Sequence, residues 1–167
     1  METKNKKELT LTRVFNAPIK RVWNALTTPG QFVKWYGLSN STMSDMKMDV
    51  RVGGGWSGVM HIPGYPDISW RAEYIEVNPP EKLVFKLKNP DDHNDPNTET
   101  VTIILRDLDS NIIRGLDSKT EMFFNQSGNL PDDEYQKALR DGWTSFFNRL
   151  DEVLDYDEFL PKNKTQE

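Results

Sequence analysis

RVGGGWSG, residues 51–58, contains three glycines at the spacing of a dinucleotide-binding G-x-G-x-x-G loop. Such a loop binds phosphate only where it follows a strand and begins a helix whose N-terminus faces the anion. The next eight residues, VMHIPGYP, contain two prolines and a glycine and cannot form that helix. From Trp56 to Ile62, apolar or small residues instead recur at every second position, which is the period of a strand. We therefore interpret Gly53 to Gly55 as a β-bulge or sharp bend in a curved sheet.

Strand patterns separated by turn signals continue on both sides of this stretch, from residue 42 to about residue 126. The alternation predicts strands at residues 43–52, 55–62, 68–77 and 82–88, around Val101 to Leu105, and around Thr120 to Phe124. Residues 107–118 either extend the strand that precedes them or begin a bulged hairpin. Because no helical pattern interrupts this run, we expect one antiparallel meander.

The N-terminal part of the chain predicts a strand followed by two short helices. The strand covers residues 8–15, and the first helix covers residues 18–27. The second helix is short and carries Phe32, Val33 and Trp35.

A long helix is predicted at the other end of the sequence. Pro131 opens it, and apolar residues from Tyr135 to Leu154 recur with a period of about 3.6 residues. Gly142 lies in the middle of this helix, where glycine costs about 1 kcal/mol of helix propensity relative to alanine. We expect a strand or an aromatic ring to approach the helix closely at Gly142 and offset that cost.

Length and composition limit the possible classes of protein. A chain of 167 residues fits a single domain, and a net charge of −5 disfavours nucleic acid as the main partner. The absence of cysteine excludes disulfides, thiolate nucleophiles and thiolate metal sites, and it fits a reducing cytoplasm. The charged first residues lack the apolar segment of a signal peptide, and no apolar run reaches the ~20 residues that span a bilayer. We expect a cytoplasmic protein with no membrane span, no metal and no cofactor.

The order of elements describes an α+β helix-grip fold. In this fold a curved antiparallel sheet wraps around a long C-terminal helix, and here two short helices follow the first strand. We expect residues 1–8 to be a flexible N-terminus, residues 9–156 to form the domain, and residues 157–167 to be a polar C-terminal tail. Monomer and dimer are both left open.

Five short motifs in this order resemble one family within that fold. They are RVFNAP at 13–18 with Val22-Trp23, then Trp35, RVGG at 51–54, NPPEKLV at 78–84, and Gly142-Trp143 followed by Leu150. Together they resemble the homologues of the C-terminal domain of the activator of the 90-kDa heat-shock-protein ATPase. That family belongs to the START-like, polyketide-cyclase and pollen-allergen (SRPBCC) superfamily, and the resemblance covers roughly Leu9 to Leu154. It implies a cavity between the sheet and the last helix, and members that bind lipids, sterols, polyketides or plant hormones.

The candidate ligand-binding residues are the rings and flexible side chains expected to face the space between sheet and helix. They are Trp35, Trp56, Met60, Trp70, Tyr74, Phe85, Phe124, Trp143 and Phe147. The alternative is that these side chains fill the core and leave no cavity. Among them, Trp56, Met60, Tyr74, Trp143 and Phe147 are the expected ligand contacts.

Titratable residues on two of the predicted strands are weaker candidates. His61 is either a general base or a half-exposed strand residue on the side opposite Trp56. On the strand at 68–77, regular alternation places Glu76 on the same face as Tyr74, where it could anchor a polar headgroup. The alternative for Glu76 is a solvent-facing ion pair across strands.

Three functions follow from these observations. The first is binding of a small hydrophobic or amphipathic molecule in a cavity between the sheet and the C-terminal helix. The second is a chaperone-associated or regulatory protein-interaction module that uses Trp23 or Trp35 as a surface anchor. The activators that give the family its name carry an additional N-terminal module, whereas here eight residues precede the predicted domain. The third is a cyclase- or hydrolase-like enzyme that uses the same cavity, with His61 as its candidate catalytic group.

Overall fold

The structure is a computed structural model that describes residues 7–38, 40–108, 118–128, 130 and 132–159. Its elements are β1 (Lys7–Phe15), α1 (Ile19–Thr27), α2 (Pro29–Trp35), β2 (Thr42–Met48), β3 (Gly55–His61), β4 (Ile68–Asn78), β5 (Lys82–Leu87), β6 (Glu99–Asp107), β7 (Thr120–Gly128) and α3 (Asp133–Phe159). The predicted strands and helices are all present, mostly with ends shifted by a few residues.

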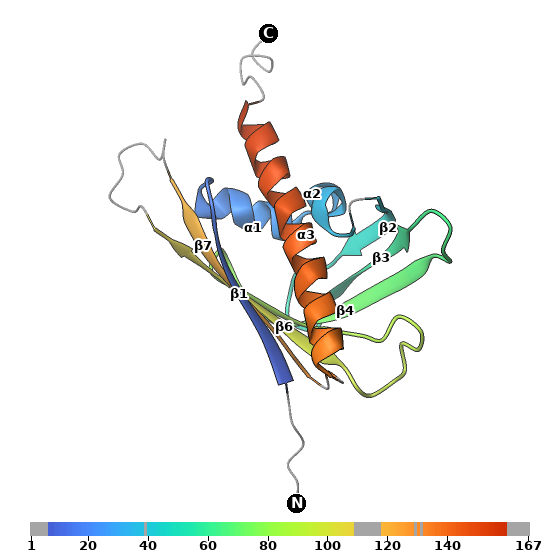
Figure 1. The fold of residues 1–167 in the computed structure, drawn as a ribbon. Helices are drawn as coiled ribbons and strands as arrows, with labels where there is room; N and C mark the ends of the chain where they lie inside the picture. The colour runs from blue at the N-terminus through green and yellow to red at the C-terminus, as the bar shows by residue number, and fades with distance from the viewer. Residues whose placement is uncertain (1–6, 39, 109–117, 129, 131, 160–167) are drawn as a thin grey trace, which may run out of the picture.

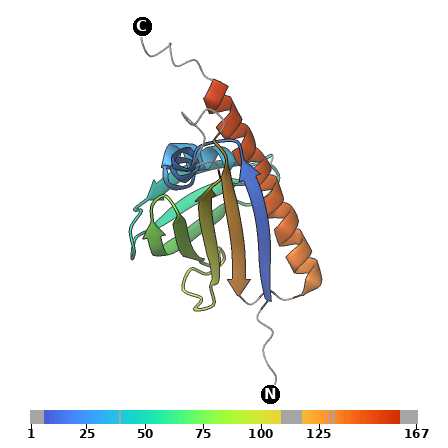
Figure 2. The same ribbon diagram turned by 90° about the vertical axis from the view of Figure 1, so that its left-hand side faces the viewer.

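The seven strands form one antiparallel sheet in the order β1-β7-β6-β5-β4-β3-β2. Consecutive strands from β2 to β7 lie side by side, and β1 pairs with β7 along its whole length. The sheet is strongly curved, and α3 lies across its concave side, while α1 and α2 lie near the C-terminal half of α3 (Figure 1). After a quarter turn, α3 is seen running alongside β1 (Figure 2). The predicted α+β helix-grip fold is confirmed.

Arginine side chains hold α3 against the rest of the fold. Arg149 donates from Nη1 to the backbone carbonyls of Gly37 and Leu38, at 3.1 and 2.7 Å. Arg13 on β1 donates from Nη2 to Asn148 at 2.7 Å and to Asp151 at 3.2 Å. These bonds connect the C-terminal half of α3 to the α2–β2 connection and to an edge strand, so the position of the helix over the sheet is fixed at that half.

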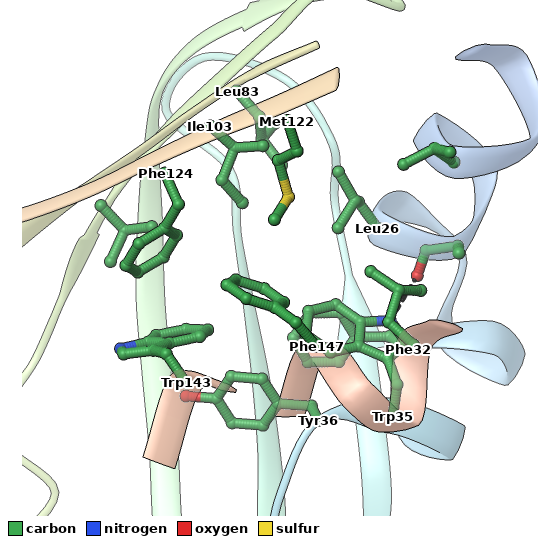
Figure 3. Packing of buried hydrophobic residues seen from close by; sticks show 14 of the residues in the cluster. Leu26, Phe32, Trp35, Tyr36, Leu83, Ile103, Met122, Phe124, Trp143 and Phe147 are labelled. Atoms are coloured by element: carbon green, nitrogen blue, oxygen red, sulfur yellow. Dashed lines mark hydrogen bonds between the residues drawn. The ribbon is translucent and has the colours of Figure 1, made fainter. Parts of the chain in front are cut away.

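A continuous core fills the space between α3, the two short helices and the sheet (Figure 3). Phe124 on β7 lies 4.5 Å from Trp143 on α3, between ring centroids. Phe32 stacks on Tyr36 at 4.8 Å, which extends the same cluster beneath α2. Close-packed aromatic rings of this kind bury a large apolar area each.

The glycine-rich stretch forms the bulge that its sequence predicts. The N–H of Gly53 donates to the carbonyl of Tyr74 at 3.1 Å, and the N–H of Tyr74 donates to the carbonyl of Gly54 at 2.9 Å. Two residues of one strand therefore face a single residue of the next, which defines a β-bulge. Gly53 has a φ of 89°, and a Cβ on Gly55 would lie 2.1 Å from the carbonyl oxygen of Ala72. Side chains are excluded there, and the predicted strand at 43–52 ends at Met48.

A second bulge overturns the facing predicted for Glu76. The β4–β5 register pairs Tyr74 with Phe85 and Glu76 with Val84, so one extra residue, Ile75, lies between the two pairs. The shift turns Glu76 to the exposed face, where its carboxylate lies 3.3 Å from Lys82. Glu76 is a solvent-facing partner in an ion pair and not a buried headgroup anchor.

The expected ends of the domain fall mostly outside the described residues. β1 begins at Lys7 and α3 continues to Phe159, so the first strand and the last helix extend into the segments predicted as termini. The rest of those segments, Pro131, and most of the ambiguous segment 107–118 lie outside the described residues. Among the helices described, none is both long and apolar enough to span a membrane.

Candidate functional site

A cleft of about 610 Å³ lies between the N-terminal half of α3 and the sheet. Its apolar wall comes from the α2–β2 connection, from β3, β4 and β5 with their connections, and from α3. The residues of this wall are Tyr36, Leu38, Met60, Ile62, Ile68, Trp70, Leu87, Leu139, Trp143 and Phe146. The volume lies within the range of roughly 300–1,000 Å³ that small-molecule sites occupy.

The polar residues of the cleft come from one end of the fold. They are supplied by the β5–β6 connection, the start of β6, the end of β7 and the first turn of α3, and they are Lys88, Asn89, Asp95, Asn97, Thr98, Glu99, Gln126 and Tyr135. The cleft therefore has an apolar wall and a polar end, the arrangement that suits an amphipathic molecule.

Three side chains at the polar end form a hydrogen-bonded relay. The indole N–H of Trp143 donates to Oε1 of Gln126 at 2.7 Å. Nε2 of Gln126 donates in turn to Oε1 of Glu99. Both hydrogen bonds fix the orientation of the Gln126 amide, since its carbonyl faces a donor and its amino group faces an acceptor. Burial raises the pKa of the Glu99 carboxyl above its ordinary value, because the surroundings of Glu99 disfavour its charged form.

Aromatic rings form the deepest part of the apolar wall. Tyr36 lies 5.0 Å from Phe146 and 6.1 Å from Trp70, measured between ring centroids, and Trp143 lies 5.1 Å from Phe146. Burial raises the pKa of Tyr36, so its hydroxyl stays protonated at neutral pH. Trp70 has an indole Nε1 that is buried and has no hydrogen-bond partner among the described residues. The wall thus combines flat apolar surfaces with a few polar atoms.

Gly142 faces open space, which corrects the close approach predicted for it. A Cβ built on Gly142 would meet nothing within 4 Å, and the residue lines the cleft. The missing side chain therefore leaves room between α3 and the sheet and does not admit a strand or ring. Glycine at this position costs α3 about 1 kcal/mol of helix propensity relative to alanine, and its missing side chain keeps the cleft open.

The nine predicted cavity residues divide between the cleft and the core. Met60, Trp70 and Trp143 line the cleft. The other six side chains, which lie in the core cluster and do not line the cleft, are Trp35, Trp56, Tyr74, Phe85, Phe124 and Phe147. Several of them surround a residual space of only about 10 Å³, the size of roughly one water-sized probe. Packing, not a second cavity, accounts for their burial.

The candidate surface anchors, Trp23 and Trp35, and the candidate catalytic residue, His61, do not line the cleft either. Trp35 is 1% exposed and donates its indole N–H to the carbonyl of Ala25 at 2.8 Å, so it is no surface anchor, whereas Trp23 is partly buried. His61 alternates with the buried Met60, as predicted, and does not line the cleft.

His61 bridges two side chains at the edge of the sheet. Its Nε2 lies 2.7 Å from Oγ of Ser44, and its Nδ1 lies 2.9 Å from Oδ1 of Asp67. This Ser-His-Asp row could not be predicted from the sequence, because its members come from β2, β3 and the β3–β4 connection. The imidazole is 40% exposed and the carboxylate 62% exposed, so water competes for both hydrogen bonds. Among the described residues, no group of three or more His, Asp or Glu side chains could hold a metal ion.

Glu99 and Gln126 were not among the predicted site residues, although the strand patterns contain a signal for both. In β7, the alternation of Met122 and Phe124 continues to Gln126, which is 1% exposed. In β6, the inward positions run back from Val101 to Glu99. A polar residue that continues an inward-facing apolar series marks a position where the sheet borders something other than packed core.

Comparisons with known proteins agree with this architecture. A crystal structure of a protein from Nitrosomonas europaea is similar at 24% identity with a TM-score of 0.73, over 90% of this chain and 95% of that chain. A Chromobacterium violaceum protein is similar at 22% identity with a TM-score of 0.74, over 88% and 96% of the two chains. A Silicibacter pomeroyi protein is similar at 19% identity with a TM-score of 0.71, over 90% and 99%. These likenesses show the fold alone.

No curated protein matches the chain. Residues 16–155 match the family described as Activator of Hsp90 ATPase homolog 1-like protein. This match includes α1, α2, all strands from β2 to β7, and most of α3. The chain therefore belongs to the Activator of Hsp90 ATPase homolog 1-like family.

Proposed function

We propose that this protein binds a small hydrophobic or amphipathic molecule in the cleft between the sheet and the N-terminal half of α3. The observation that carries the proposal is a space of about 610 Å³ with an aromatic wall and one polar end. Unfilled apolar surface of this kind is unfavourable in water, and a ligand that covers it gains roughly 25 cal/mol for each Å² removed from solvent. The fold family contains ligand-binding proteins, which is consistent with this use of the cleft.

The contacts expected for the ligand follow from the lining. Met60, Trp70 and Phe146 would contact its apolar part, because their side chains face the cleft from β3, β4 and α3. Glu99 and Tyr135 would face its polar part. Trp143 lies between the two regions, with its ring against Phe146 and its N–H on Gln126.

Heteronuclear NMR of the indole N–H groups tests the proposal at the level of single residues. The chain has five tryptophans, of which Trp70 and Trp143 line the cleft, while Trp23 and Trp35 do not. Titration with phenylbutanol, a neutral probe, is expected to shift the Trp70 and Trp143 resonances and leave those of Trp23 and Trp35 in place. A titration that shifts no indole resonance, or shifts that of Trp23 alone, would contradict binding in the cleft.

Native mass spectrometry of the freshly purified protein provides an independent test with the cell's own ligand. An excess mass that disappears under denaturing conditions is expected, and it would give the mass of the bound molecule directly. In a variant with Gly142→Phe, whose added ring occupies the cleft, the excess mass should be absent. An excess mass that persists in this variant would mean that the molecule binds elsewhere.

A further inference from the structure

Glu99 has a carboxylate whose protein partners leave it incompletely satisfied. It begins β6, opposite Leu87 of β5, and accepts a hydrogen bond from Gln126. Gln126 is 1% exposed, and its carbonyl is already engaged by the indole N–H of Trp143. Within the described parts of the chain, no basic side chain forms an ion pair with Glu99. A carboxylate can accept several hydrogen bonds, so Glu99 retains accepting capacity at the wall of the cleft.

The other charged side chains of the cleft do not neutralise Glu99. Asp95 is held by the backbone N–H of Asn97 at 3.0 Å and by Nδ2 of Asn89 at 3.1 Å, and these bonds lower its pKa and keep it ionised. Lys88 also lines the cleft and is the single basic residue among the described residues of the lining. Among the described residues that line the cleft, acidic side chains therefore outnumber basic ones.

Two aromatic side chains of the cleft are coupled to Glu99. Tyr135 faces the cleft from the first turn of α3, and the negative charge of Glu99 adds to burial in raising the pKa of the Tyr135 hydroxyl. Trp143 is connected to Glu99 through Gln126. Glu99 therefore lies where the polar end of the cleft meets its aromatic wall.

An anionic headgroup would be repelled by the ionised Asp95 carboxylate, whereas a protonated amine would donate hydrogen bonds to Glu99 and favour the charged form of its carboxyl. We propose that the molecule bound in the cleft carries a protonated amine at its polar end and that this amine is seated on Glu99. The inference rests on the proposed function of the cleft and adds to it the chemical class of the ligand. The apolar part of such an amine would lie among Met60, Trp70 and Phe146.

Calorimetric titration with three probes of one skeleton tests the headgroup. Phenylbutylamine, phenylbutanol and phenylbutyrate share a ring and a chain and differ in charge at neutral pH. A hydrogen bond to a charged partner predicts that the amine binds about tenfold or more tightly than the alcohol, with the carboxylate weakest. If the alcohol or the carboxylate binds as tightly as the amine, the assignment is wrong. If none of the three binds, the proposed function itself fails.

Substitution of the carboxylate locates the preference. Glu99→Gln keeps the shape of the side chain and an oxygen that can accept from Gln126, and it should abolish the advantage of the amine over the alcohol. Glu73→Gln, on the exposed face of β4, removes the same charge outside the cleft and should change neither affinity. An amine preference that survives Glu99→Gln would overturn the role of Glu99. The three-probe comparison on the unmodified protein decides the headgroup class even if this variant does not fold.

Discussion

Replacing Gly142 is expected to stabilise the protein and to obstruct its cleft, two effects that can be separated by the size of the new side chain. Alanine adds one methyl group, whereas phenylalanine adds a ring that projects from α3 toward the sheet. A Cβ at this position meets nothing within 4 Å, so neither change begins with a steric clash.

The expected gain in stability follows from helix propensity. Gly142 lies in the interior of α3, where alanine is favoured over glycine by about 1 kcal/mol. For a domain of this size, that gain corresponds to a rise in melting temperature of roughly 2–4 °C. Urea unfolding followed by circular dichroism measures the change, and Gly142→Ala should raise the unfolding midpoint without changing the slope.

The effect on binding distinguishes a ligand site from a gap that has no function. Gly142→Phe should weaken phenylbutylamine binding by about tenfold or more, as expected when a ligand loses more than about 1.4 kcal/mol of contact. Gly30 on α2 provides the matched control, because a Cβ there also meets nothing within 4 Å and the residue is not part of the cleft lining. Gly30→Phe should leave binding unchanged. The reasoning is refuted if Gly142→Phe binds the probe like the unmodified protein, or if Gly142→Ala lowers stability.

Three further predictions concern individual side chains. The pKa of Glu99 in the folded protein lies above its ordinary value of 4.5, so its contribution to stability is full below pH 4.5 and is lost as the pH rises through the raised pKa. Over this pH interval, Glu99→Gln should therefore gain stability relative to the unmodified protein in urea unfolding. A difference in stability that stays constant at all pH values would contradict this. Tyr74 has a buried hydroxyl without a partner among the described residues, so Tyr74→Phe should be neutral or stabilising, whereas a loss above about 1 kcal/mol would mean that the hydroxyl is hydrogen-bonded. His61→Ala should leave phenylbutanol affinity in calorimetry unchanged, because His61 does not line the cleft; a large loss would assign it to the site.

The sequence predicted the fold well because its strongest signals are periodic. Alternation from Trp56 to Met60 placed these side chains on the inner face of β3, and the structure confirms that facing. The helical stripe ending at Leu154 likewise placed one face of α3 against the sheet, and Leu150 and Leu154 are fully buried. Such patterns record which face of an element the core covers, because a shift of one residue in a strand would turn its apolar residues to solvent.

Irregularities in the strands limited what the sequence could predict about the site. Ile75 inserts one residue between Tyr74 and Glu76, and nothing in the sequence marks that insertion because Ile75 itself suits a strand. Each bulge reverses the facing of the residues beyond it, so the carboxylate at Glu76 was a weaker candidate than its position in the alternation implied. Rotation and tilt of α3, which decide whether Phe147 or Phe146 faces the cleft, are likewise set by packing and not by period.

The cleft nevertheless has a composite signature that spans three elements. Along α3, the apolar stripe is fully buried at Leu154 and becomes 38% exposed at Tyr135. On the sheet, the inward series of β6 ends in Glu99 and that of β7 ends in Gln126, and the antiparallel register brings these two residues to the same end. Gln126 is buried but hydrogen-bonded at both ends of its amide, whereas the Glu99 carboxyl would be costly to enclose in a packed core, so its position there favours open space beside it. The cleft therefore lies where α3 becomes exposed and where β6 and β7 carry polar residues on their inner faces. The pattern of any one of these elements alone would not have identified it.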